Sequence, residues 1–151
     1  PTHRARRSVP SNTKTTLGLE KSGIKQTTAR LAVLNFLKTS KKPVDVLEII
    51  DYLKKEKIDA DKVTIYRILD LFLEKGLVNR LEFQEGKFRY ELSEGHHHHI
   101  ICISCKNVED IDIQNDVTKH EKFIQQTKNF KVLNHSLEFF GLCKNCQKLT
   151  K

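Results

Sequence analysis

Four consecutive histidines stand in the second half of this 151-residue sequence, and their spacing is that of metal ligands. The run from His96 to His99 leads directly into the β-prone residues IICIS. Side chains alternate between the two faces of a strand, so His96 and His98 are expected on one face and His97 and His99 on the other. Each pair offers two imidazoles, which predicts halves of two metal sites. The alternatives are a purification tag and a merely polar surface strand.

The four cysteines of the chain form two pairs with identical spacing, Cys102 with Cys105 and Cys143 with Cys146. Two converging Cys-x-x-Cys pairs form the tetrahedral site of a structural zinc ion. Disulfides are the alternative, but the basic N-terminus is not followed by the apolar segment of a secretory signal, and cytosolic thiols stay reduced. The pairs therefore predict a structural Zn²⁺ site in a cytoplasmic protein.

One further histidine, His135, lies in the sequence FKVLNHSLEFFGLC, residues 130–143. Its alternating pattern predicts a strand on which His135 shares a face with apolar residues. A lone histidine in that position is usually a core residue. Because two His-x-His pairs lie nearby, we expect His135 to be a metal ligand instead.

The elements before the histidines predict a winged helix-turn-helix. Apolar residues recur at helical spacing over residues 27–38, 46–55 and 63–76, with Gly76 as the stop of the third helix. Two strand-like runs follow, residues 77–83 and 87–92, joined by a short turn. The third helix would present Val63, Tyr66 and Arg67 outward near its N-terminal end, where such helices read the major groove. A three-helix bundle with a purely structural role is the alternative.

The residues that follow the histidine run predict a smaller α/β domain. A strand is expected over residues 108–113 and a helix over residues 117–127, so the fold class is α+β. We expect a basic tail over residues 1–15 that is disordered or derived from expression. A DNA-binding domain is expected over residues 16–92 and a metal-binding dimerisation domain over residues 93–151.

The charge distribution supports this division. Residues 1–90 hold 19 basic and 11 acidic side chains, whereas residues 91–151 hold 8 of each. A basic module next to a neutral one indicates that the first binds a polyanion such as DNA. No apolar run approaches the roughly 20 residues that cross a bilayer, so we expect no membrane association.

The motifs together resemble the ferric uptake regulator family. VTIYRILD, LEKGLV, KFRYEL, the histidine run entering Cys-x-x-Cys, and NHSLEFFGLC occur in that family's order over roughly residues 17 to 147. The resemblance implies a homodimeric repressor, not an enzyme. When loaded with metal it would bind palindromic double-stranded DNA operators and shut off iron or zinc uptake genes.

Site residues follow from the resemblance. It implies structural zinc at the four cysteines and a regulatory Zn²⁺ or Fe²⁺ at Glu91, His97 and His99. An additional metal would bind His96, His98 and His135 with Asp116, for which Glu121 and His120 are rivals. DNA contacts would come from Lys25, Arg30, Val63, Thr64, Tyr66 and Arg67.

One departure concerns the regulatory site. Many family members place a histidine just before the second helix, where this sequence has Lys42 and Pro43, so Glu82 or solvent would have to replace that ligand.

Three other functions compete with a metal-responsive repressor. A zinc hydrolase is disfavoured because no His-Glu-x-x-His motif occurs in the sequence. A peroxide-sensing family member and a zinc-binding protein without DNA function remain as alternatives.

Overall fold

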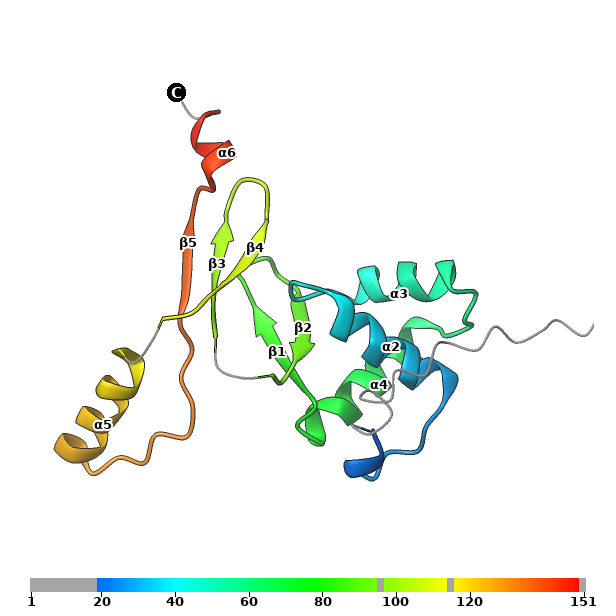
Figure 1. Ribbon diagram of the computed structural model, residues 1–151, viewed down its shortest axis with the longest axis horizontal. Helices are drawn as coiled ribbons and strands as arrows, with labels where there is room; N and C mark the ends of the chain where they lie inside the picture. Colours follow the sequence, from blue (N-terminus) through cyan, green and yellow to red (C-terminus); the bar gives the residue numbers. More distant parts are fainter. Residues whose placement is uncertain (1–18, 95–96, 114–115, 150–151) are drawn as a thin grey trace, which may run out of the picture. The chain divides into compact units, whose positions relative to one another are not determined.

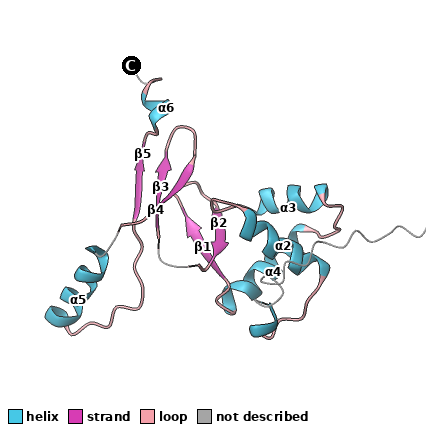
Figure 2. Cartoon of the chain, in the orientation of Figure 1, coloured by secondary structure: helices cyan, strands magenta, loops and turns pink. Residues whose placement is uncertain are grey.

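The computed structural model describes residues 19–94, 97–113 and 116–149. The chain divides into two compact units between Ser93 and Glu94. Helices α2, α3 and α4 and the strands β1 and β2 belong to the first unit, and β3, β4, α5, β5 and α6 to the second (Figures 1 and 2). The mixture of helices and strands confirms the predicted α+β class.

The three helices of the first unit form where the apolar spacing predicted them. They are α2 (Thr28–Thr39), α3 (Val46–Lys55) and α4 (Lys62–Glu74). Each begins at a side chain that accepts a hydrogen bond from a free amide of the first turn: Thr27, Asp45 and Asp61 respectively. At the end of α4, Gly76 has a φ of 70°, the left-handed conformation expected of the predicted stop.

The apolar faces of these helices form one core. Ile65, Leu69 and Phe72 of α4 are fully buried, and they belong to one cluster with Val33 of α2 and Ile49 of α3. Each such side chain contributes roughly 1.5–3 kcal/mol by its burial. Since the inward face of α4 is occupied in this way, its other face remains exposed.

A hairpin completes the first unit. Strand β1 (Val78–Glu82) pairs antiparallel with β2 (Phe88–Leu92). Val44, just before α3, forms an isolated bridge with Tyr90 of β2, through two backbone hydrogen bonds of 2.9 and 2.7 Å. The hairpin is thereby fixed to the segment that precedes α3, as a wing is in a winged helix.

The second unit is a three-stranded sheet in the order β4-β3-β5. The central strand β3 (His98–Cys102) pairs antiparallel with β4 (Val108–Ile111) and parallel with β5 (Glu138–Gly141). Helix α5 (Asp116–Lys128) lies between β4 and β5 in the chain, and α6 (Lys144–Gln147) follows β5. None of the helices in the described ranges is long and apolar enough to cross a bilayer.

The predicted strand around His135 is wrong. Residues 129–137 form no regular structure, and β5 begins only at Glu138. The four residues of β5 pair with residues 99–102 of β3. Before that point the chain leaves the sheet, and His135 contacts Glu121 of α5.

Candidate metal centres and nucleic-acid interface

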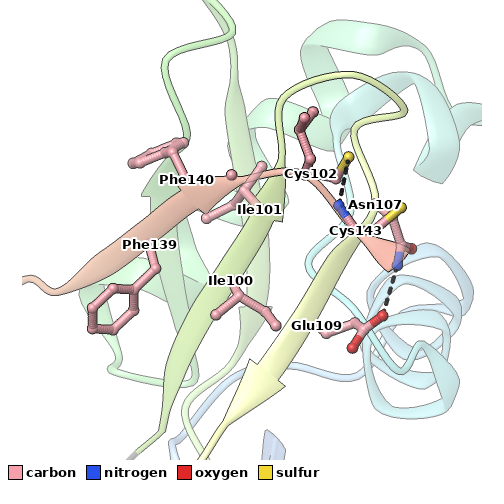
Figure 3. Close-up of a pocket in the computed structure, with 10 residues that line it drawn as sticks. Ile100, Ile101, Cys102, Asn107, Glu109, Phe139, Phe140 and Cys143 are labelled. Carbon is pink, nitrogen blue, oxygen red and sulfur yellow. Dashed lines mark hydrogen bonds between the residues drawn. The ribbon is translucent and has the colours of Figure 1, made fainter. Parts of the chain in front are cut away.

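The four cysteines come together as the sequence predicted for a zinc site. The four Sγ atoms all lie within 4.8 Å of one another; they belong to Cys102, Cys105, Cys143 and Cys146. Cys105 Sγ is 3.8 Å from Cys143 Sγ. Strand pairing explains this convergence. Cys102 is the register partner of Gly141, so both Cys-x-x-Cys segments leave the sheet at the same end (Figure 3).

Local backbone structure shapes each pair. After Cys102, the chain makes a tight turn in which the Lys106 amide donates to the Cys102 carbonyl at 2.9 Å and Lys106 has a φ of 65°. Cys143 is the N-cap of α6, and Cys146 lies within that helix. All four are free cysteines in the structure, and these four sulfurs make up the donor set that Zn²⁺ prefers for structural sites.

The electrostatics of this four-cysteine cluster favour a cation. Backbone hydrogen bonds from Cys105 and Cys143 lower the pKa of the Cys102 thiol to about 6. The Cys143 amide is 3.4 Å from Cys102 Sγ, and Figure 3 shows this contact. One thiolate therefore forms readily near neutral pH. A second negative sulfur at such distances would be repelled, unless a metal ion neutralised the charge.

A second cluster joins two histidines to a carboxylate that the sequence did not predict as a ligand. The Nε2 atoms of His97 and His99 lie 3.9 and 3.5 Å from Asp110 Oδ1. The two imidazole rings meet edge to face, with centroids 4.9 Å apart. His99 is buried, whereas Asp110 is half exposed. We call these three residues the histidine–carboxylate cluster.

Strand register places Asp110 there. Residue 110 of β4 lies directly opposite His99 of β3, so both side chains project from the same face of the sheet. The sequence predicted a strand starting at Val108 but not its register with the histidine strand. The first Cys-x-x-Cys pair was the available signal. A tight antiparallel turn over residues 102–107, which contain that pair, places residue 110 opposite His99.

His98 points to a different set of partners from those of its two neighbours. Its ring centroid is 5.2 Å from that of His135, and His135 Nδ1 is 2.6 Å from Glu121 Oε1. The Nε2 atoms of both histidines are buried. The structure thus brings His98, His135 and Glu121 together, whereas His120 is exposed on α5. His96 and the side chain of Asp116 lie outside the described residues.

The remaining predicted regulatory ligand, Glu91, lies in the first unit. It is on β2, opposite Asn79 of β1, and is partly exposed. Five residues separate it from His97 along the chain.

Helix α4 presents the predicted DNA-contacting residues. Val63 and Tyr66 are 57% and 40% exposed, and Thr64 and Arg67 are also exposed. All four lie in the N-terminal half of the helix, opposite the buried face. Lys25 precedes α2 and Arg30 lies in its first turn, where the Arg30 guanidinium donates to the Lys25 carbonyl at 2.8 Å.

Ion pairs and hydrogen bonds stabilise the hairpin and connect it to the start of α3. Arg89 of β2 is buried, and its guanidinium donates to both carboxylate oxygens of Glu85 at 2.8 and 2.9 Å. A third bond reaches the Pro43 carbonyl at 3.2 Å. Lys87 contacts the Asp45 carboxylate at 2.6 Å. Hydrogen bonding to Glu85 raises the pKa of Arg89, which therefore stays charged.

Comparison with known proteins places these features in one family. The model of the ferric uptake regulator family matches residues 21–140. The ferric uptake regulation protein of Legionella pneumophila is 33% identical over 131 residues, which cover 85% of this chain and 96% of that protein. The peroxide-responsive repressor PerR of Staphylococcus saprophyticus is 31% identical over 129 residues, covering 85% and 86%.

A solved structure has the same fold. The ferric uptake regulator from Francisella tularensis, solved with iron, superimposes with a TM-score of 0.72 at 26% identity. The match covers 83% of this chain and 96% of that one. Both units described above therefore have counterparts in a single known architecture.

Proposed function

Because the chain belongs to the ferric uptake regulator family of metal-responsive transcriptional regulators, we propose that it represses metal uptake genes in the cytoplasm. It would do so as a metal-loaded homodimer bound to palindromic operators, without enzymatic activity. The observation that carries the proposal is the histidine–carboxylate cluster, which lies five residues along the chain from the hairpin of a winged helix.

We assign three metal sites to this function. The four-cysteine cluster would hold structural Zn²⁺. The ion would neutralise the thiolates and connect the segments that follow β3 and β5. Glu91, His97, His99 and Asp110 would form the regulatory site. His98, His135 and Glu121, with His96 and Asp116 as further candidates, would form the additional one. Imidazole and carboxylate ligands accept both Zn²⁺ and Fe²⁺.

Regulation would follow from ligands that belong to different units. Glu91 extends from the hairpin, whereas His97, His99 and Asp110 belong to the second unit. Closing these side chains on one ion would restrict the orientation of the two recognition helices of a dimer. A palindromic operator requires half-sites about one helical turn apart or a multiple of it, so this restriction raises DNA affinity.

Exposed apolar surface supports the homodimer. Strand β5 is an edge of the sheet, and its Phe139 and Phe140 are 44% and 38% exposed. They line a pocket of about 200 Å³ together with Ile100 and Ile101 (Figure 3). An uncovered edge strand with aromatic side chains is suited to pairing with another copy.

The proposal predicts a metal-dependent change in operator affinity. Removing the labile metal with a mild chelator should weaken operator binding roughly 5- to 150-fold, which corresponds to typical allosteric coupling of about 1–3 kcal/mol. Fluorescence anisotropy with titrated Zn²⁺ and Fe²⁺ measures this change and identifies the sensed ion. Zinc analysis should show that the four-cysteine cluster stays loaded. Equal operator affinity of stripped and loaded protein would contradict metal regulation.

A second prediction tests Asp110 as a ligand. Asp110→Asn retains the shape but removes the negative charge, so the labile site should lose at least about 10-fold in metal affinity, the smaller effect known for supporting residues of metal sites. Competition with a chromophoric chelator measures the affinity. Glu109→Gln is the matched control, because Glu109 is adjacent on β4 and faces the other way, accepting a bond from Asn107 at 3.0 Å. Identical metal affinity of the two variants would remove Asp110 from the site.

Peroxide sensing is a second candidate function. The similarity to PerR favours it, and the regulatory ligands are suited to iron. Mass spectrometry of iron-loaded protein after peroxide treatment distinguishes the two functions, because a peroxide sensor gains oxygen on His97 or His99 and a metal sensor does not.

A further inference from the structure

A groove lies beside the recognition helix, within the first unit. It is formed by the start of α3, the N-terminal half of α4 and the hairpin, and has a volume of about 300 Å³. This is the lower end of the range for small-ligand sites, so the groove has room for one segment of an extended chain. Its lining includes Asp45, Leu47, Lys62, Tyr66, Lys87 and Phe88.

Two lysines from different elements line this groove. Lys62 is the first residue of α4, and its ammonium lies 6.0 Å from the centroid of the Tyr66 ring. Lys87 belongs to the hairpin and its side chain is 45% exposed. Ammonium groups from both the helix and the hairpin therefore line the groove, and the Lys87 group is paired with Asp45 at 2.6 Å.

Asp45 is the one acidic residue of the lining, and its negative charge is balanced by the groups that it contacts. Its carboxylate accepts the Glu48 amide at 2.8 Å and the Lys87 ammonium at 2.6 Å. Hydrogen bonding to Lys87 and Glu48 outweighs burial and lowers the pKa of Asp45, so it remains a carboxylate. An ammonium group has three N–H donors, so Lys87 can bind Asp45 and an anion together.

Leu47 and Phe88 add exposed apolar surface to the lining, whereas Val46 and Tyr90 are buried at its base. Leu47 is 62% exposed and Phe88 44%, and the Arg80 guanidinium lies 4.4 Å from the Phe88 ring centroid. A groove lined by both ammonium and apolar groups matches a sugar-phosphate strand. The phosphate would lie near the lysines and the deoxyribose against the rings.

We infer that this groove binds one sugar-phosphate segment of the duplex whose bases α4 reads, with Lys62 and Lys87 as its phosphate contacts. The inference rests on the proposed DNA-binding function. Helices of this kind read bases with their N-terminal residues while neighbouring elements contact the backbone. The groove adjoins Tyr66, one of the base-reading candidates of α4, so the strand beside the major groove would enter it.

The test measures duplex affinity against salt. Metal-loaded full-length protein carrying Lys62→Gln or Lys87→Gln is titrated with the operator and with a random duplex, from about 50 to about 200 mM salt. Removing one phosphate contact should make the negative slope of log K against log salt shallower by about 0.9. Between about 50 and about 200 mM salt, the variant should therefore lose about 3.5-fold less affinity than the wild-type protein does. Both duplexes should weaken by the same factor, because a phosphate contact carries no sequence information.

Lys55→Gln is the matched control. It removes one charge from the exposed C-terminal turn of α3, away from the groove, and should leave the slope at the wild-type value. If Lys62→Gln and Lys87→Gln also keep the wild-type slope, or weaken only the operator, the backbone assignment is overturned. Metal dependence is a separate readout. Failure of wild-type protein to respond to metal refutes the proposed regulation, while the random-duplex slopes still test the groove.

Discussion

Cys143→Ser should abolish zinc binding at the four-cysteine cluster and unfold the second unit. Apparent binding free energies of structural Zn²⁺ are about 10–16 kcal/mol at neutral pH, and most of this stabilises the fold. The second unit has few other sources of stability. In the described residues its buried apolar side chains are limited to Ile101, Val108 and two of the cysteines themselves.

Elemental analysis and hydrogen exchange measure this outcome. The variant should contain about one zinc fewer per chain, and amides of β3 and β5 should lose protection while those of α4 keep it. Lys144→Ala is the matched control, since it alters the same turn of α6 without removing a sulfur. Full zinc content and unchanged protection in Cys143→Ser would show that the cluster does not hold a structural ion.

Arg89→Met should destabilise the first unit by about 3–5 kcal/mol. The Glu85 side chain is only 8% exposed, so loss of its partner leaves a buried carboxylate without its main compensation. The Pro43 carbonyl also loses a donor. A double variant, Arg89→Met with Glu85→Leu, should recover most of the loss, because apolar replacement of both partners removes the uncompensated charge.

Intrinsic fluorescence can follow this unit alone. The chain has no tryptophan, and its three tyrosines, Tyr52, Tyr66 and Tyr90, all lie in the first unit. Urea unfolding of the full chain followed by tyrosine emission therefore reports the stability change. Arg80→Met is the control in the same hairpin, because the Arg80 side chain is exposed and its guanidinium lies over the face of the Phe88 ring. A loss in Arg89→Met no larger than in Arg80→Met would show that the buried pair does not stabilise the hairpin.

Elements set by local patterns were predictable from the sequence. The apolar repeat of Ile65, Ile68, Leu69 and Phe72 predicted α4, because one helix face must be buried whatever the partner. Gly76 marked its end, because few other residues adopt a positive φ without strain. The four-cysteine cluster was predictable for a similar reason, since the spacing within each pair is itself the chemical signal.

Features that depend on register or on distant contacts were not predictable. Asp110 reaches the histidines only through its pairing with His99, and nothing local distinguishes it from Glu109. The buried Arg89 contacts the Pro43 carbonyl across 46 positions, and a single arginine in a hairpin looks like a surface residue. The alternation around His135 suggested a strand, but residues 129–137 form no regular structure and His135 contacts Glu121 of α5.

The parallel pairing of β3 with β5 also determines the order in which the protein can mature during translation. Cys143 follows Cys102 by 41 positions, so the ribosome must synthesise α5, β5 and α6 before the second unit can close. The first unit consists of consecutive elements in local contact and is complete much earlier. A nascent chain would thus present α4 before its four cysteines can come together. In a zinc-starved cell, completed chains whose second unit stays open would be accessible to chaperones and proteases.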